Sequence, residues 1–266
     1  MLERLQTGWA CNDSLLCVGL DPIRGRLPEV FRQSPSGLKD FCCAIVEACA
    51  PYVCAFKPQA AHFGAEGAED QLAEVIAFIH QRYPDIPVIL DAKRGDIGAT
   101  AELYAKEAFE RYRADIVTVN PYLGPESLNP YLGYPGRGVA VLCRTSNPDS
   151  GWLQGYPEDE PVYLRVARAA VDWNTNDNVM LVAGATYPRE LARIREVVGQ
   201  LPLLIPGIGA QGGDLQAALL AGLDQKGRGL VINASRSVLY AADDEQFADA
   251  AETAAKDARD AIRAHA

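Results

Sequence analysis

Histidine is scarce in this sequence, where only His62, His80 and His265 occur among 266 residues. No spacing among histidine, cysteine and acidic residues matches a transition-metal site, which argues against one, although a magnesium site built from carboxylates stays open. We expect His62 on a loop, His80 within a helix and His265 in the tail. A Gly-x-Ser-x-Gly elbow and a Walker loop are also missing, so two common catalytic signatures are excluded.

Paired cysteine motifs are missing as well, since the cysteine count is odd and contains no Cys-x-x-Cys pair. The seven are Cys11, Cys17, Cys42, Cys43, Cys49, Cys54 and Cys143. Most stand in apolar surroundings, so we expect buried free thiols in a reducing, cytoplasmic compartment. No signal-peptide pattern opens the chain and no apolar run approaches a membrane span, so no membrane partner is expected.

Positive charge is in deficit, with 25 Lys and Arg against 35 Asp and Glu and a net charge of −10. This deficit argues against a nucleic-acid-binding surface, but a small anionic ligand needs only local positive charge. Hydrophobic residues make up 48% and charged residues 23% of the chain, as in ordinary globular proteins. No linker or low-complexity segment divides the chain, so we predict a single domain over residues 1–266.

Short apolar, β-branched runs alternate with helical patterns along the chain. The predicted strands are 15–20, 53–56, 88–90, 116–119, 139–142, 180–183, 203–205 and 230–232. The predicted helices are 38–50, 68–82, 99–113, 162–173, 188–198, 215–221 and a last one at about 244–263. Such alternation predicts an α/β protein with a parallel sheet, and about eight units match a (β/α)₈ TIM barrel.

A doubly wound open sheet is the alternative fold. That fold usually carries a Gly-x-Gly-x-x-Gly phosphate fingerprint after its first strand, where this chain has Gly19-Leu-Asp-Pro22. The first strand therefore favours the barrel.

A cluster of charges follows the third predicted strand, in the stretch from Val88 to Gly98 that reads VILDAKRGDIG. Residues two apart in a strand project to the same face, so we expect Asp91 and Lys93 side by side, with Asp96 on the loop. Buried charges are costly unless paired, so three together suit an active site better than a core. A surface ion pair at a strand end is the alternative.

Polar residues follow most other predicted strands, at the end where a barrel holds its active site. They are Asp21, Lys57, Asn120, 144–146 and 233–236, and the seventh strand ends in Pro206-Gly-Ile-Gly209. Solvation alone would not arrange polar groups so regularly. Taken singly, however, Asp21 could start a turn and Lys57 could be a solvated strand end. We interpret Asn120, which precedes a proline, as a turn residue.

A glycine-rich loop, Gly207-Ile-Gly-Ala-Gln-Gly-Gly213, stands between the seventh strand and the next helix. Its glycines let backbone N–H groups approach an anion, and the helix start adds a favourable dipole. Arg236, after the eighth strand, can add a forked positive charge. Because barrels often bind phosphate after strands seven and eight, we predict a phosphate site here. A plain glycine-rich connection beside a surface arginine is the alternative.

Taken together, these motifs resemble the orotidine 5′-phosphate decarboxylase family. Asp91-Ala-Lys-Arg-Gly-Asp96 is similar to its Asp-x-Lys-x-x-Asp signature, and Lys57 to the lysine that completes its Lys-Asp-Lys-Asp array. Further matches are Leu20-Asp-Pro22, Arg144-Thr-Ser-Asn-Pro148, residues 206–213 and Ala234-Ser-Arg236. The resemblance runs from about residue 15 to residue 240 and is greatest to the longer bacterial branch, type 2.

The resemblance implies decarboxylation of orotidine 5′-phosphate to uridine 5′-phosphate (UMP), the last step of de novo UMP biosynthesis, with no metal and no other cofactor. It implies that Lys93 protonates C6 of the pyrimidine as carbon dioxide leaves. Asp91 would lie beside the substrate carboxylate and hold Lys93, while Lys57 and Asp21 would contact ribose hydroxyls.

The resemblance also implies a homodimer with shared active sites, in which Asp96 and Thr100 reach into the site of the partner subunit. Ser146 would hydrogen-bond the pyrimidine edge. Gln211 and Arg236 would hold the substrate phosphate, and Gly209 and Pro206 would be further substrate-binding residues.

Three other functions remain as alternatives. A Schiff-base aldolase needs a neutral lysine, whereas carboxylates beside a lysine favour its charged form. A magnesium-dependent sugar-phosphate decarboxylase of a related family would have a glutamate ligand near the position of Lys57. A phosphate-binding barrel without catalysis is the third, and the intact charge array argues against it.

Overall fold

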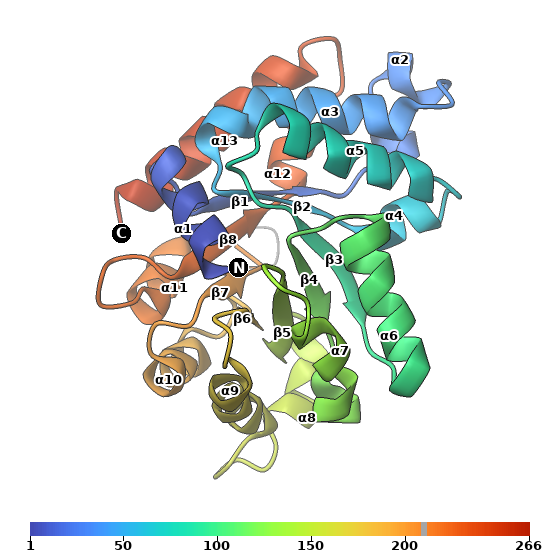
Figure 1. The fold of residues 1–266 in the computed structure, drawn as a ribbon. Helices are drawn as coiled ribbons and strands as arrows, with labels where there is room; N and C mark the ends of the chain where they lie inside the picture. Colours follow the sequence, from blue (N-terminus) through green and yellow to red (C-terminus); the bar gives the residue numbers. More distant parts are fainter. Residues whose placement is uncertain (209–211) are drawn as a thin grey trace.

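Eight parallel strands form one sheet that curls around a common axis (Figure 1). The computed structural model describes residues 1–208 and 212–266. The strands are β1 (Leu16–Leu20), β2 (Ala55–Pro58), β3 (Ile89–Arg94), β4 (Ile116–Val119), β5 (Gly138–Arg144), β6 (Val179–Ala183), β7 (Leu203–Ile205) and β8 (Leu230–Ala234). Their order is β2-β1-β8-β7-β6-β5-β4-β3, and the bridges Phe56↔Val88 and Gln59↔Asp91 bring β3 back against β2. The predicted (β/α)₈ barrel is confirmed.

Helices surround the strands. The longer ones are α1 (Leu2–Cys11), α3 (Gly37–Cys49), α5 (Glu69–Arg82), α6 (Gly98–Lys106), α9 (Val162–Trp173), α10 (Pro188–Val198), α11 (Leu215–Gly222) and α13 (Phe247–Arg263). The short ones are α2 (Glu29–Arg32), α4 (Ala60–Gly64), α7 (Asn129–Leu132), α8 (Gly151–Gln154) and α12 (Arg236–Leu239). Single turns are η1 (Arg24–Arg26), η2 (Ala50–Tyr52), η3 (Glu107–Arg111), η4 (Pro121–Leu123), η5 (Pro125–Ser127) and η6 (Pro148–Ser150).

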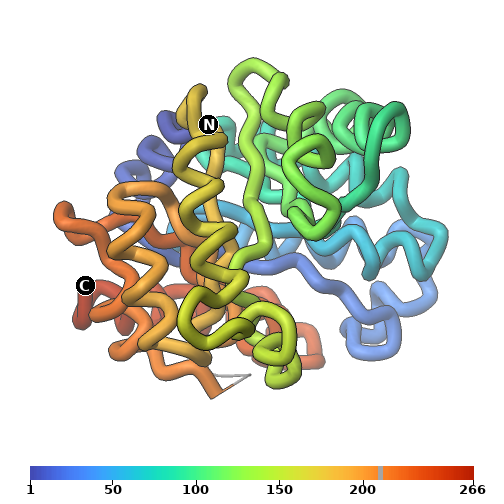
Figure 2. The backbone as a smooth tube through the Cα atoms, turned by 90° about the horizontal axis from the view of Figure 1, so that it is seen from below, coloured from blue at the N-terminus to red at the C-terminus, as the bar shows by residue number. Residues whose placement is uncertain are grey.

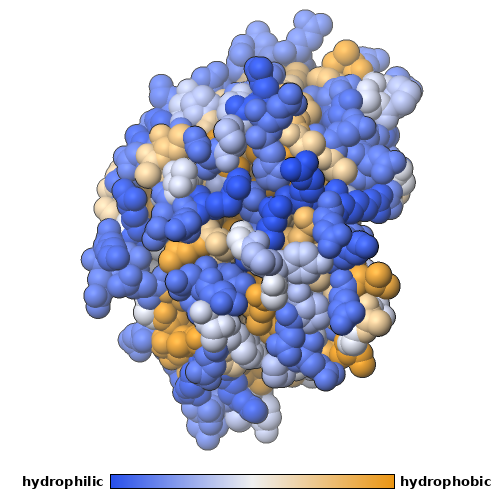
Figure 3. Space-filling model, in the orientation of Figure 1, coloured by the Kyte–Doolittle hydropathy of each residue, from blue (hydrophilic) through white to orange (hydrophobic). Residues whose placement is uncertain are grey.

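Apart from the carboxyl ends of β3 and β8, the strands are almost entirely buried, which explains why they read as continuous apolar runs. Every residue of β1 and β6 is buried. Outside the sheet, α9, α10 and α11 pack next to one another (Figure 2). Hydrophilic side chains cover most of the face seen in Figure 3, with apolar ones scattered between them. Over the described parts of the chain, no helix has both the length and the apolar composition needed to cross a bilayer.

The structure corrects three local expectations. Residues 2–11 form a helix that sequence reading missed, and Trp9 of this helix donates from Nε1 to the Leu230 carbonyl at 2.9 Å. The predicted helix 99–113 ends as α6 at Lys106 and continues as a π-helical turn. His62 lies in α4 rather than on a loop, and its Nδ1 is 2.9 Å from the Pro22 carbonyl oxygen.

A buried arginine ties the amino-terminal ends of β7 and β8 to neighbouring helices. Arg195 of α10 donates to the carbonyls of Gly222 at 2.7 Å, Gly199 at 2.7 Å, Leu201 at 2.8 Å and Gly229 at 3.0 Å. Burial lowers the pKa of its guanidinium to about 10, which leaves it charged at neutral pH. All four partners are backbone groups at the barrel end opposite the strand carboxyl termini. The role of this arginine is therefore to join these segments and stabilise the fold.

Replacing Arg195 tests its contribution to stability. We expect Arg195→Met to lower the free energy of unfolding by about 3 kcal/mol, because four carbonyls lose a charged donor. Urea denaturation followed by circular dichroism measures the change. The exposed Arg228 offers a control at the same end, and Arg228→Met should stay within about 0.5 kcal/mol of the parent. Equal effects of the two substitutions would contradict the assignment.

Candidate active site

A cavity of about 870 Å³ opens at the carboxyl ends of the strands. Its lining includes Asp21, Lys57, Asp91, Lys93, Ser146 and Arg236, which come from five different strand ends. Sequence reading expected these side chains to meet, and in the structure they border one cavity. Active sites of TIM barrels lie at this end because loops that differ freely in sequence converge there.

One carboxylate joins two ammonium groups at the base of the cavity. Asp91 Oδ2 accepts from Lys57 Nζ at 2.8 Å, and Asp91 Oδ1 accepts from Lys93 Nζ at 2.6 Å. Lys57 is 5% exposed and Asp91 is 7% exposed. The alternatives of a surface ion pair and a solvated strand end are therefore wrong, since Lys57 and Asp91 are buried and all three side chains border the cavity.

In this array, burial and the neighbouring charges shift the pKa of each buried group in opposite directions. Burial by itself raises the pKa of the Asp91 carboxyl, but the charges of Lys57 and Lys93 outweigh it and hold that pKa well below its usual value. For Lys57, burial lowers the pKa, while Asp91 and then Asp21 raise it, and the net pKa lies above its usual value. The Asp91–Lys57 pair is therefore ionised at neutral pH.

The backbone at Lys93 departs from a regular strand. Its φ is +47°, and the pairing of β3 with β4 shifts register between Leu90 and Arg94. Positive φ is unusual for a residue with a side chain, and such strain persists only where its surroundings enforce it. Asp91 and Lys93 thus meet through an irregular turn of the strand rather than through simple alternation.

Thr118 of β4 stabilises this irregular backbone, and sequence reading missed it. Its Oγ1 accepts from Ala92 N at 3.0 Å and from Lys93 N at 2.9 Å, and donates to Asp91 Oδ1 at 3.0 Å. One hydroxyl therefore fixes both the strained peptide and the central carboxylate. Its sequence signal was weak, since a threonine inside an apolar strand usually reflects only β-propensity.

Two buried oxygens at the cavity have no hydrogen-bond partner among the described residues. They are Asp21 Oδ1, directly after β1, and Asn233 Oδ1, in the neighbouring strand β8. Buried acceptors without a donor are costly, so both are suited to accept from a bound molecule. Gly19 allows the two strands to approach here, because a Cβ at that position would lie 1.9 Å from Ser235 Oγ.

The expected phosphate end is only partly described. Pro206 and Arg236 line the cavity, whereas Gly209 and Gln211 lie outside the described residues. Asp214 caps α11, with Oδ1 accepting from Ala217 N at 2.9 Å. That amide is already occupied, so the start of α11 offers less to an anion than the sequence suggested.

Asp96 and Thr100 do not border the cavity of their own chain. Asp96 Oδ1 accepts from Ile97 N at 2.8 Å, and Thr100 lies in the first turn of α6. Thr100 instead borders a hollow on the outer face of α6 together with Leu103 and Tyr104. The turn interpretation of Asn120 is supported, because its side chain accepts from Tyr122 N at 3.0 Å. Among the residues that the structure describes, no group of three or more His, Cys, Asp or Glu is arranged to hold a metal ion.

Comparisons with known proteins agree on one family. The model of the "Orotidine 5′-phosphate decarboxylase / HUMPS family" matches residues 14–261. A relative from Dechloromonas aromatica named orotidine 5′-phosphate decarboxylase is 56% identical over 263 residues, which cover 98% of this chain and 97% of that protein. A relative of the same name from Ralstonia nicotianae is 56% identical over 262 residues, with the same coverage. The solved structure of Leishmania donovani OMP decarboxylase is 41% identical, covers 99% of this chain and 97% of that one, and superposes with a TM-score of 0.86.

The buried array predicts a specific dependence of stability on pH. Asp91→Asn leaves two ammonium groups without their counter-charge, so we expect a loss of about 3 kcal/mol in the free energy of unfolding near neutral pH. The folded-state pKa of Asp91 lies below its unfolded value. The advantage of the parent is therefore full above about pH 4 and shrinks as the pH falls below it.

Urea denaturation of both proteins between about pH 7 and about pH 2.5 measures this difference. Asp149→Asn, at an exposed residue that also lines the cavity, is the matched control and should show little difference at any pH. An Asp91→Asn difference that stays constant over the whole range would contradict the ionised buried array.

Proposed function

Because the chain belongs to the orotidine 5′-phosphate decarboxylase family, we infer that it converts orotidine 5′-phosphate to uridine 5′-phosphate, the last step of UMP biosynthesis. The observation that carries this conclusion is the buried Lys57–Asp91–Lys93 array at the mouth of the barrel. Loss of carbon dioxide leaves an electron pair on C6 with little resonance relief. Fixed cations placed where that charge develops stabilise it more than water can.

Lys93 is the proton donor in this proposal. The bond between C6 and the carboxylate breaks, the electron pair stays on C6, and a proton from Lys93 Nζ forms the new C6–H bond. Lys93 then regains a proton from solvent, which its partly exposed side chain permits. Asp91, 2.6 Å from that nitrogen, holds the ammonium in position beside the substrate carboxylate.

The remaining cavity residues bind the nucleotide. Asp21 and Lys57 contact ribose hydroxyls, and Asn233 is added to them because its buried Oδ1, which has no donor among the described residues, can accept from a hydroxyl. Ser146 bonds the pyrimidine edge. The phosphate end is formed by Arg236 and Pro206, together with Gln211 and Gly209.

The same array separates this function from its alternatives. A Schiff-base aldolase needs an uncharged lysine, but both cavity lysines contact Asp91. A magnesium-dependent relative needs an oxygen ligand where Lys57 stands. Binding of UMP with no turnover would instead favour a barrel without catalysis.

A homodimer with shared sites explains why Asp96 and Thr100 lie outside their own cavity. Apolar side chains at α6 and at η4, the turn after β4, are exposed to solvent, with Ile97 at 50%, Leu103 at 67%, Tyr122 at 74% and Leu123 at 47%. Exposed apolar groups gathered near one surface indicate a protein contact. A second copy of the chain covering them would bring each Asp96 toward the partner's cavity.

We further propose that residues 1–266 act as one domain in the cytoplasm, with no nucleic-acid partner. All seven cysteines are free, and five of them are buried, as expected for a reducing compartment.

Turnover is tested directly by adding orotidine 5′-phosphate and following the loss of its ultraviolet absorbance. The reaction should proceed in EDTA, because lysines stand where metal ligands would be. Activity lost in EDTA and restored by magnesium would favour the sugar-phosphate relative instead.

Two substitutions separate chemistry from binding. Lys93→Ala should lower kcat by roughly a thousandfold or more while UMP binding survives, because it removes the proton donor. Arg236→Ala should weaken nucleotide binding by roughly tenfold to a hundredfold, because it removes a charge from the phosphate. Steady-state kinetics and calorimetric UMP titration measure both. Near-normal turnover in Lys93→Ala would show that another group donates the proton.

Shared sites are tested by mixing two inactive variants. Lys93→Ala and Asp96→Ala should each be nearly inactive alone. After joint unfolding and reassembly, a mixed dimer holds one site with both residues intact, so about a quarter of all sites should recover. Asp96 and Lys93 acting within one subunit would gain nothing from mixing. The lack of recovery, with subunit exchange shown by a mass tag on one variant, would therefore reject the shared site.

A further inference from the structure

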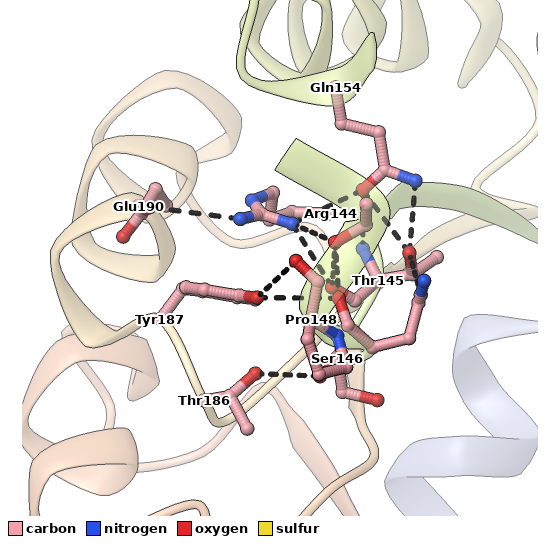
Figure 4. A network of polar contacts seen from close by, with 10 residues as sticks. Arg144, Thr145, Ser146, Pro148, Gln154, Thr186, Tyr187 and Glu190 are labelled. Carbon is pink, nitrogen blue, oxygen red and sulfur yellow. Dashed lines mark hydrogen bonds and ion pairs between the residues drawn. The ribbon is translucent and has the colours of Figure 1, made fainter. Parts of the chain in front are cut away.

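Arg144, the last residue of β5, is a buried cation beside the cavity but not in its lining. Only 4% of it is exposed. Its Nη1 donates to the Thr145 carbonyl at 3.2 Å and to Ser150 Oγ, and its guanidinium lies 3.6 Å from the centre of the Tyr187 ring (Figure 4). The side chain therefore points away from the cavity, into a polar network behind its wall.

The charge of Arg144 is poorly matched by its surroundings. The one carboxylate oxygen within 4.0 Å among the described residues is Glu190 Oε1, at 4.0 Å from Nη2. Its Nε, also buried, has no partner among those residues. Burying a charge against neutral groups is expensive. A residue that served only stability would be better satisfied, as Arg195 is by its four carbonyls.

The groups around Arg144 hold residues 145–147 from two sides. On one side, Gln154 Oε1 accepts from Thr145 N at 2.8 Å, and its Nε2 donates to Thr145 Oγ1 at 2.9 Å. On the other side, Thr186 Oγ1 donates to the Ser146 carbonyl at 3.1 Å, and the Tyr187 hydroxyl to the Asn147 carbonyl at 3.3 Å. Figure 4 shows Arg144 between these two sets of contacts.

The segment held in this way forms one wall of the cavity. Thr145, Ser146, Asn147 and Gln154 all line it. The wall packs closely against the residue after β6, because a Cβ on Gly184 would lie 2.7 Å from Ser146 Cα. Arg236 lies on a different strand end, after β8. A shift of this wall would therefore change contacts to the base without reaching the phosphate contact of Arg236.

We propose that Arg144 is a positioning residue that sets the affinity of this site for the pyrimidine base without touching it. Its guanidinium, stacked on Tyr187 and bonded to Thr145 and Ser150, fixes the segment 145–147 so that Ser146 faces the base. This inference rests on the proposed function, in which Ser146 bonds the pyrimidine edge.

The test compares two ligands that share a phosphate but differ in the base. UMP and ribose 5-phosphate are each measured as inhibitors of the decarboxylation, and also by calorimetry. In Arg144→Met, we expect the inhibition constant of UMP to rise about tenfold while that of ribose 5-phosphate changes less than about twofold. The KM for orotidine 5′-phosphate should rise with that of UMP, because both carry the base.

Conservative and control variants make the comparison specific. Arg144→Lys keeps the charge but loses the planar fork and its stacking on Tyr187, so it should recover only part of the UMP affinity. Tyr187→Leu removes the ring and should shift the same ligand ratio, which keeps the proposal testable if Arg144→Met does not fold. Arg195→Met, the other buried arginine, should lose stability and keep the ligand ratio of the parent.

The outcomes separate the positioning role of Arg144 from the proposed function. Equal weakening of UMP and ribose 5-phosphate, no weakening of either, or the same ratio change in Arg195→Met would overturn the positioning role. Failure of the parent protein to turn over orotidine 5′-phosphate would instead refute the proposed function. The parent is assayed first, so the two failures are distinguished.

Discussion

The site depends on a single buried carboxylate that is shared by two ammonium groups. Without Asp91, Lys57 and Lys93 would face each other's charge at a depth where Lys57 is almost fully desolvated. The negative charge of Asp91 offsets the repulsion between the two ammonium groups. Thr118 in turn donates a hydrogen bond that holds the Asp91 carboxylate in place. The result is a preorganised cationic site, which does not have to reorganise when charge develops on a substrate.

The two ends of the barrel use buried charge differently. At the amino-terminal end, Arg195 is fully engaged with backbone carbonyls, and Asp115 is bonded by His80, Arg137 and a backbone amide. At the carboxyl end, Asp21 and Asn233 each keep a buried oxygen unpartnered within the described chain, and both residues border the cavity. Complete satisfaction stabilises the fold, whereas incomplete satisfaction leaves groups available to a ligand.

The cavity walls are connected across strands rather than along the chain. Thr118 of β4 supports the backbone of β3, and Tyr187, after β6, supports the segment after β5. A closed barrel permits this because each strand end has two neighbours. Residues at one strand end therefore hold in place the cavity residues of the next strand end.

The sequence by itself determined the barrel, because eight apolar runs alternating with helical patterns have few other solutions, and the order of the strands confirmed it. It also identified Asp21, Lys57, Asp91, Lys93, Ser146 and Arg236 as strand-end residues, and all line one cavity. It did not reveal Thr118 or the outward turn of Arg144, and it assigned His62 to a loop. Those features were decided only by tertiary structure: hydrogen bonds between distant segments bend Lys93 into positive φ and turn Arg144 away from the cavity, and no local pattern encodes such contacts.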